Sequence, residues 1–99
     1  MSTTDLSHLL VEYRDRILAI AARYGVHHVR VFGSAARGDV HQSSDVDLLV
    51  RLEEGRSLFD LGGFQFEVQE LLGCRVDVAM DYGQNTPFTA RVRREARAL

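Results

Sequence analysis

Lysine is absent from this chain, so all 12 of its basic side chains are arginine. The formal net charge of −2 argues against a domain that is held to nucleic acid by a basic surface, and we expect no strong nucleic-acid binding. The missing lysine has one chemical consequence: a phosphate contact from a cationic side chain must come from arginine.

Other absences narrow the class of protein further. The single cysteine, Cys74, excludes an internal disulfide and fits a reducing compartment. No apolar run approaches the ~18 residues of a membrane span. The opening "MSTTDLSHLL" lacks both the basic start and the apolar core of a secretion signal. With no repeat and no Pro/Ser-rich linker, residues 1–99 are expected to form one cytoplasmic domain.

Hydrophobic periodicity predicts the order helix, strand, strand, helix, strand, helix. The expected helices cover residues 5–24, 57–72 and 87–97, and the expected strands cover residues 28–32, 45–51 and 74–80. The Gly62-Gly63 pair counts against the second helix, because a glycine costs ~1 kcal/mol relative to alanine inside a helix. The order predicts a small α/β (α+β) fold, in which helices cover a mixed sheet of three or more strands.

Particular residues are expected to begin and end these helices. Thr4 and Ser57 are plausible N-caps, because a side-chain oxygen accepts from the free N–H groups of the first turn. Gly25 and Gly73 are plausible helix ends, because glycine adopts positive φ without a Cβ clash. Pro87 suits the first turn of the last helix.

Two carboxylates interrupt the second apolar strand, at Asp45 and Asp47. Residues two apart in a strand share a face, so both acids point one way while Val46, Leu48 and Val50 point into a core. Like charges about 7 Å apart on one sheet face repel each other. A hard divalent cation such as Mg²⁺ would turn this repulsion into a binding site, whereas a solvated strand edge would only relieve it.

A third acid, Asp77, lies between Val76 and Val78 in the third apolar strand. If the second and third strands are neighbours, Asp77 joins Asp45 and Asp47 at one place. Three converging carboxylates can hold two cations about 3.5–4 Å apart, the arrangement used for in-line displacement at phosphorus.

The first strand ends in Gly33-Ser34, which is followed by a small-residue turn. A strand that leads into a helical turn exposes backbone N–H groups that can bind phosphate oxygens. Gly33 permits close approach and Ser34 adds a hydroxyl donor. Arg37 is a candidate bidentate contact to a triphosphate, with a solvated arginine as the alternative.

The spacing of these residues resembles a known signature. "GS" at 33–34, ten intervening residues, "DVD" at 45–47 and later "VDV" at 76–78 are similar to the nucleotidyltransferase motif of the DNA polymerase β superfamily. The chain length and leading helix resemble the minimal nucleotidyltransferases, the MntA-type antitoxins that are paired with HEPN-domain toxins.

The resemblance implies a polymerase-β-like fold and a protein adenylyltransferase activity. AMP would pass from ATP to a hydroxyl, with release of pyrophosphate. Gly33 and Ser34 would hold the triphosphate, Asp45 and Asp47 would ligate two Mg²⁺ ions, and Asp77 would ligate the ion near the attacking hydroxyl and help to deprotonate it. The implied acceptor is a tyrosine of the HEPN ribonuclease, bound in a hetero-oligomer.

Two other functions stay open at this point. One is a non-catalytic module that neutralises a partner by contact, and the other is a nucleotidyltransferase for another acceptor, such as RNA or a small molecule. Larger enzymes of the superfamily carry a further domain that covers the base and binds the acceptor. In this protein we expect a partner or a second copy of the chain to provide the surface that covers the base. If replacing Asp45 and Asp47 by alanine abolishes the protection of cells from the toxin, neutralisation by contact alone is excluded.

Overall fold

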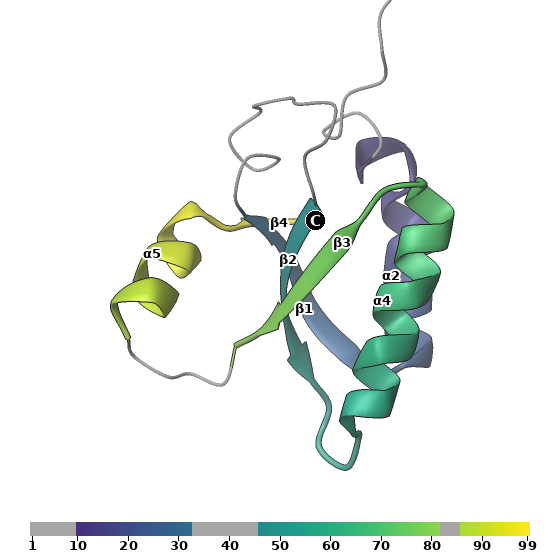
Figure 1. Ribbon diagram of the computed structural model, residues 1–99, viewed down its shortest axis with the longest axis horizontal. Coiled ribbons are helices and arrows are strands. Elements are labelled where there is room, and N and C mark those ends of the chain that lie inside the picture. Colours follow the sequence, from purple (N-terminus) through teal and green to yellow (C-terminus); the bar gives the residue numbers. More distant parts are fainter. Residues whose placement is uncertain (1–9, 33–45, 82–85) are drawn as a thin grey trace, which may run out of the picture.

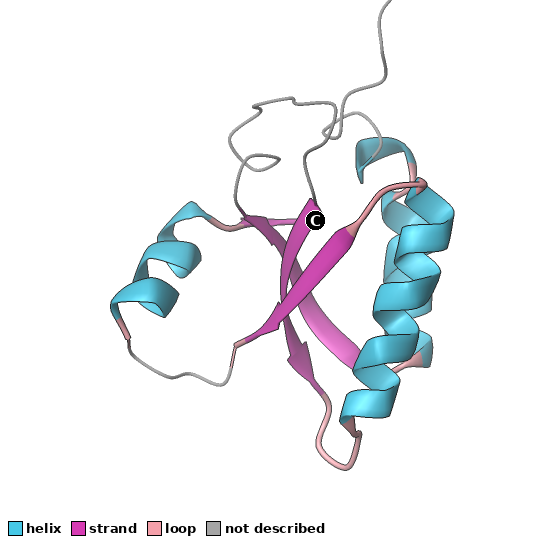
Figure 2. Cartoon of the chain, in the orientation of Figure 1, coloured by secondary structure: helices cyan, strands magenta, loops and turns pink. Residues whose placement is uncertain are grey.

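The architecture comes from a computed structural model, which describes residues 10–32, 46–81 and 86–99 (Figure 1). Its elements are, in chain order, α2 (Arg14–Arg23), β1 (Val26–Phe32), β2 (Val46–Leu52), α4 (Leu58–Leu72), β3 (Val76–Met80), α5 (Pro87–Glu95) and β4 (Arg97–Ala98). The predicted order of helices and strands is confirmed, and the short strand β4 is added after the last helix (Figure 2).

The sheet is mixed, with strand order β3-β2-β1-β4. β1 runs antiparallel to both β2 and β4, whereas β2 and β3 are parallel. Parallel neighbours need a crossover connection, and α4 provides it. The expected mixed sheet covered by helices is therefore present.

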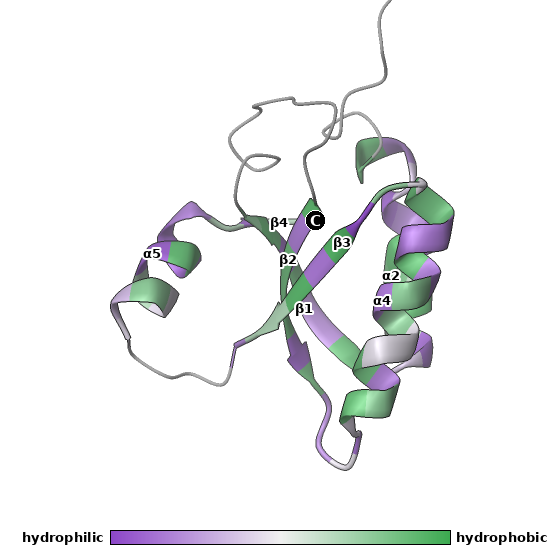
Figure 3. Cartoon of the chain, viewed as in Figure 1, coloured by the Kyte–Doolittle hydropathy of each residue, from purple (hydrophilic) through white to green (hydrophobic). Residues whose placement is uncertain are grey.

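Helices lie on both faces of the sheet: α2 and α4 on one face and α5 on the other (Figure 1). The main core forms between the sheet and the α2/α4 pair, and its buried side chains include Ile17, Ala21, Val46, Leu48, Val50, Phe64, Val68 and Val76. Figure 3 shows hydrophilic residues interrupting the hydrophobic strands, as the alternation in the sequence requires.

The helix α4 spans the glycine pair without a break. Ser57 caps it in a capping box with Asp60, and Gly73 ends it with φ of 72°. A Cβ atom on Gly63 would lie 2.5 Å from Cε1 of Tyr24, so the missing side chain lets α2 approach α4 closely. The Tyr24 hydroxyl then donates a hydrogen bond to Glu67 of α4.

Several predicted boundaries were wrong. The first helix is interrupted at Tyr13, where residues 10–12 are helical and α2 begins at Arg14, while its predicted cap Thr4 lies outside the described residues. β1 begins at Val26, two residues earlier than predicted, because Val26 and His27 already pair with Leu52 and Arg51 of β2. A β-bulge follows His27, and His28 has φ of 53°.

The later elements also differ slightly from the prediction. β3 begins at Val76, two residues later than expected. α5 ends at Glu95 because Ala96 has extended backbone and leads into β4. Within the described part of the chain, no helix is long and apolar enough to cross a membrane.

Candidate active site

The structure brings two of the three predicted acids together. Asp47 of β2 and Asp77 of β3 are direct partners in the parallel register. Neighbouring strands lie about 4.8 Å apart, and aligned residues point to the same face. Because Val46 and Val76 are fully buried against the helices, Asp47 and Asp77 point to the opposite face, where α5 lies. Asp47 is half-buried and Asp77 is exposed.

The end of β1 lies next to this pair. Phe32, the last residue of β1, is the register partner of Asp47, so Asp47 lies between Phe32 and Asp77 across three neighbouring strands. Four of the predicted site residues, Gly33, Ser34, Arg37 and Asp45, lie outside the described residues. Gly33 follows Phe32 directly in the chain, and Asp45 precedes the first residue of β2.

Two glutamines of α4 fix the backbone that carries Asp77. Gln65 Nε2 donates to the carbonyl oxygen of Val76 at 2.7 Å, and the Val76 N–H donates to Gln69 Oε1 at 3.0 Å. Because β3 is an edge strand, these bonds satisfy backbone groups that neighbouring strands leave open. The sequence reasoning missed both glutamines. Gln65 and Gln69 are one helical turn apart on the crossover helix, and this spacing was the only sign in the sequence that both could contact the same strand.

The acids fit a hard divalent cation by their chemistry. Carboxylate oxygens are the ligands that Mg²⁺ prefers, and two aligned carboxylates on one sheet face repel each other unless a cation lies between them. Among residues 10–32, 46–81 and 86–99, no group of three His, Cys, Asp or Glu side chains could hold a metal ion. The predicted third ligand, Asp45, is not among those residues.

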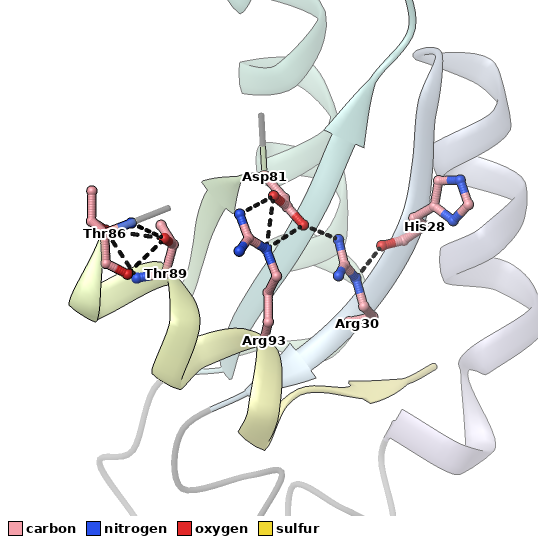
Figure 4. A network of polar contacts seen from close by, with 6 residues as sticks. All are labelled: His28, Arg30, Asp81, Thr86, Thr89 and Arg93. Atoms are coloured by element: carbon pink, nitrogen blue, oxygen red, sulfur yellow. Dashed lines mark hydrogen bonds and ion pairs between the residues drawn. The ribbon is translucent and has the colours of Figure 1, made fainter. Parts of the chain in front are cut away.

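A second charged cluster, which the sequence reasoning also missed, holds α5 over the acid-bearing face (Figure 4). The side chain of Asp81 is only 2% exposed. It accepts from Arg30 Nη2 of β1 at 3.1 Å and from Arg93 Nη2 of α5 at 3.1 Å. An acid directly after an apolar strand, followed by an arginine-rich helix, was the signal in the sequence.

A cavity of about 180 Å³ lies between α5 and this face of the sheet. The residues of the sheet that line it are Leu49, Ala79, Met80 and Asp81, and those of α5 are Phe88, Thr89, Val92 and Arg93. Leu49 and Val92 are 4% and 3% exposed, so a small second apolar contact forms here. The sequence analysis placed Asp45 and Asp47 on this face of β2 and did not consider Leu49.

The pKa shifts resolved in the described chain belong to structural contacts away from the acids. The hydrogen bond between Tyr24 and Glu67 raises the pKa of Tyr24 and lowers the pKa of Glu67. The backbone N–H of Ser57 lowers the pKa of Asp60 in the capping box. The hydrogen bonds that cause these shifts hold α2 against α4 and fix the first turn of α4.

Known proteins are similar to this chain in sequence and in fold. The model of the nucleotidyltransferase domain family matches residues 14–98. A relative from Methanocaldococcus jannaschii, MJ0435, whose name places it among protein adenylyltransferases, is 42% identical over 67 residues, which are 68% of this chain and 72% of the relative. Protein adenylyltransferase MntA of Thermococcus cleftensis is 40% identical over 73 residues, 74% of each chain.

Solved structures agree with these matches. A structure described as a minimal nucleotidyltransferase superposes over 100% of both chains with a TM-score of 0.86 and 41% identity. A toxin-antitoxin crystal structure with AMP-PNP shares the fold, with a TM-score of 0.71 at 17% identity over 85% of this chain and 69% of that one. By its sequence, its fold and its aligned strand acids, the chain therefore belongs to the nucleotidyltransferase domain family, as a minimal nucleotidyltransferase.

Proposed function

We propose that this protein is an antitoxin that transfers AMP from ATP to a tyrosine hydroxyl of a HEPN-domain ribonuclease toxin. The alignment of Asp47 with Asp77 on one sheet face carries the proposal. The Thermococcus relative is named as a protein adenylyltransferase, and a fold neighbour is a toxin-antitoxin structure with an ATP analogue. In this proposal residues 1–99 act as a single domain in the cytoplasm.

Each predicted site residue has a role in the proposal. Asp45, Asp47 and Asp77 would hold two Mg²⁺ ions. The backbone at Gly33, the Ser34 hydroxyl and the Arg37 guanidinium would bind the triphosphate. Bound Mg²⁺ would neutralise the charge that develops on the phosphate oxygens. The chain itself mainly provides positions and fixed charges, which is what phosphoryl-type transfer requires.

The proposed transfer is a single displacement at the α-phosphorus of ATP. The tyrosine oxygen forms a bond to that phosphorus, and the bond from it to the oxygen that bridges to the β-phosphate breaks. Pyrophosphate leaves with the electron pair. The proton of the tyrosine hydroxyl passes to the Asp77 carboxylate, which is exposed and therefore open to an incoming acceptor.

A protein acceptor is also supported by the outer surface of α4. Leu58, Phe59 and Phe66 are 70%, 92% and 60% exposed, and Phe59 and Phe66 lie two helical turns apart on one side. Exposed apolar groups of this size are typical of protein contact surfaces. This surface lies on the face of the sheet opposite to α5 (Figure 1), whereas Asp47 and Asp77 point toward α5. It can therefore hold a partner, but a tyrosine of that partner must reach around the sheet to meet the acids.

The test is transfer of label from α-labelled ATP to a HEPN toxin in the presence of Mg²⁺. Wild-type protein is compared with Asp47→Asn and Asp77→Asn, which remove a charge at almost constant shape. We expect each variant to lose at least ~100-fold in rate, because metal ligation contributes several kcal/mol to such transition states. Glu54→Gln, in an exposed turn, is the matched control and should keep full activity.

The same variants separate the proposal from neutralisation by contact alone. If Asp47→Asn still protects cells from the toxin as well as the wild type does, protection does not depend on transfer and the antitoxin mechanism proposed here is wrong. If label passes to RNA or to a small molecule but not to the toxin, the acceptor is wrong while the reaction type stands. Mass spectrometry of the labelled toxin identifies the modified side chain.

A further inference from the structure

The cavity beneath α5 begins next to the aligned acids. Leu49 is two residues after Asp47 on β2, and Ala79 is two residues after Asp77 on β3. Leu49 and Ala79 are partners in the same parallel register, so they form the next pair along the same face. Two residues of a strand span about 6.5–7 Å, so the floor of the cavity begins at that distance from the acids.

The walls of the cavity are mostly apolar and one of them is aromatic. Leu49 and Ala79 form the floor, Val92 is buried beside them, and Phe88 of α5 lines the cavity while remaining 55% exposed. Phe88 is therefore an aromatic side chain that lines the cavity and is still partly accessible to a ligand. Ala79 has the smallest side chain of the group, and its small size keeps the cavity open.

The wall formed by α5 is held firmly in place. Arg93 donates to the Asp81 carboxylate through Nε at 3.3 Å and Nη2 at 3.1 Å, and Asp81 also binds Arg30 of β1 (Figure 4). The first turn of α5 is fixed by the capping box of Thr86 and Thr89. Phe88 lies between these two residues in the chain, so the position of its backbone is fixed before any ligand binds.

We propose that this cavity binds the purine base of the donor nucleotide, with the base stacked on Phe88. This inference rests on the proposed function, in which Asp47 and Asp77 act at the α-phosphorus of ATP. A volume of about 180 Å³ is below the ~300–1,000 Å³ of pockets that enclose whole small molecules, so it accommodates one ring system rather than a whole nucleotide.

The distance from the acids favours the base over the acceptor ring. A phenol ring is bonded directly to its reacting oxygen, so it must lie against the acids themselves. A purine is separated from the reacting phosphorus by the ribose, which matches a subsite that begins one residue pair further along the strands. The apolar floor and the aromatic side wall suit the faces of a purine.

The inference is tested by equilibrium binding without any acceptor. The affinities of ATP and of inorganic tripolyphosphate, both with Mg²⁺, are measured by titration calorimetry for the wild type, Phe88→Ala and Phe88→Trp. Base stacking on an aromatic side chain predicts a loss of roughly 5- to 140-fold in ATP affinity for Phe88→Ala. Phe88→Trp should retain ATP affinity, and tripolyphosphate, which has no base, should bind all three proteins equally.

Two further variants make the test independent of Phe88. Ala79→Leu fills the floor of the cavity and should weaken ATP but not tripolyphosphate. Phe59→Ala, which removes an equally large ring from α4, is the matched control and should bind both ligands as the wild type does. Far-UV circular dichroism verifies that every variant is folded.

The outcomes distinguish this inference from the proposed function. If Phe88→Ala and Ala79→Leu bind ATP as tightly as the wild type, the purine subsite is refuted while the transfer reaction stands. If they keep ATP affinity but raise the KM of the protein acceptor, the acceptor ring occupies the cavity and the assignment to the base is wrong. If both ligands weaken equally, the variants have disturbed the triphosphate site, which also contradicts a base subsite. A wild-type chain that binds neither ligand contradicts the proposed function itself.

Discussion

The two adjacent glycines of α4 should respond in opposite ways to the same substitution. A Cβ atom on Gly62 meets nothing within 4 Å, whereas one on Gly63 lies 2.5 Å from Cε1 and 3.0 Å from Cζ of Tyr24. Both positions lie inside the helix, so alanine should gain ~1 kcal/mol of helix propensity at each. At Gly62 nothing opposes that gain.

At Gly63 the gain is opposed by a clash with the Tyr24 ring. Overpacking of this kind costs ~1–3 kcal/mol, so Gly63→Ala should be net destabilising by about 1 kcal/mol. If the Tyr24 ring turns aside to avoid the clash, its hydroxyl also loses part of its hydrogen bond to Glu67, which further lowers the free energy of unfolding. The two variants should therefore differ by about 3 kcal/mol if the clash costs ~3, and by at least ~1 if it costs the minimum.

Urea denaturation followed by circular dichroism measures both free energies of unfolding. For a domain of this size, Gly62→Ala should raise Tm by about 4–8 °C. The same pair is then made in a Tyr24→Ala background, where the clash is absent and Gly63→Ala should stabilise as Gly62→Ala does. If Gly63→Ala is as stable as Gly62→Ala in the presence of Tyr24, the packing argument is refuted.

Three more predictions follow from contacts described above. Asp81→Ala should destabilise the protein by about 3 kcal/mol in the same urea assay, because it leaves Arg30 and Arg93 beside each other without their anion; an unchanged stability would show that solvent replaces Asp81. Ser57→Ala should cost ~1 kcal/mol by removing the N-cap of α4, and Ser57→Asp should restore most of it. The pKa of Glu67 is lowered by the Tyr24 hydroxyl and by Arg23, so its stabilising contribution is complete above its ordinary value of 4.5 and is lost as the pH falls through the lowered value. Glu67→Gln should flatten that acid-side loss of Tm, and an unchanged pH profile would contradict the assignment.

Much of the fold was predictable because local patterns decide it. The alternation of Val46, Leu48 and Val50 with Asp47 requires one buried face, and Ser57 and Gly73 bound a helix that the structure confirms. The glycine pair that counted against this helix has a tertiary cause at Gly63, where a ring from α2 needs the space. No local pattern reveals that a residue twenty or more positions away requires a small neighbour.

The alignment of Asp47 with Asp77 could be predicted from the sequence, whereas the contacts that support these two residues could not. Asp47 and Asp77 were identified as charges inside apolar strands, and their alignment depended only on whether β2 and β3 were neighbours. The contacts of Asp81 with Arg30 and of Gln65 with Val76 join elements far apart in the sequence. These contacts depend on the packing of α5 and α4 against opposite faces of the sheet. A single sequence does not show on which face each helix packs.

The two glutamine bonds to Val76 also determine how this protein can lose activity. β3 is an edge strand, so it can detach by a local opening that leaves β1, β2 and α2 folded. Such an opening separates Asp77 from Asp47 without global unfolding. The amide hydrogen of Val76 is held by Gln69, so its exchange with solvent reports this opening directly. In Gln69→Ala, β3 should therefore open independently of the rest of the domain. Enzymatic activity should then be lost at a lower urea concentration than the far-UV circular dichroism signal of the helices.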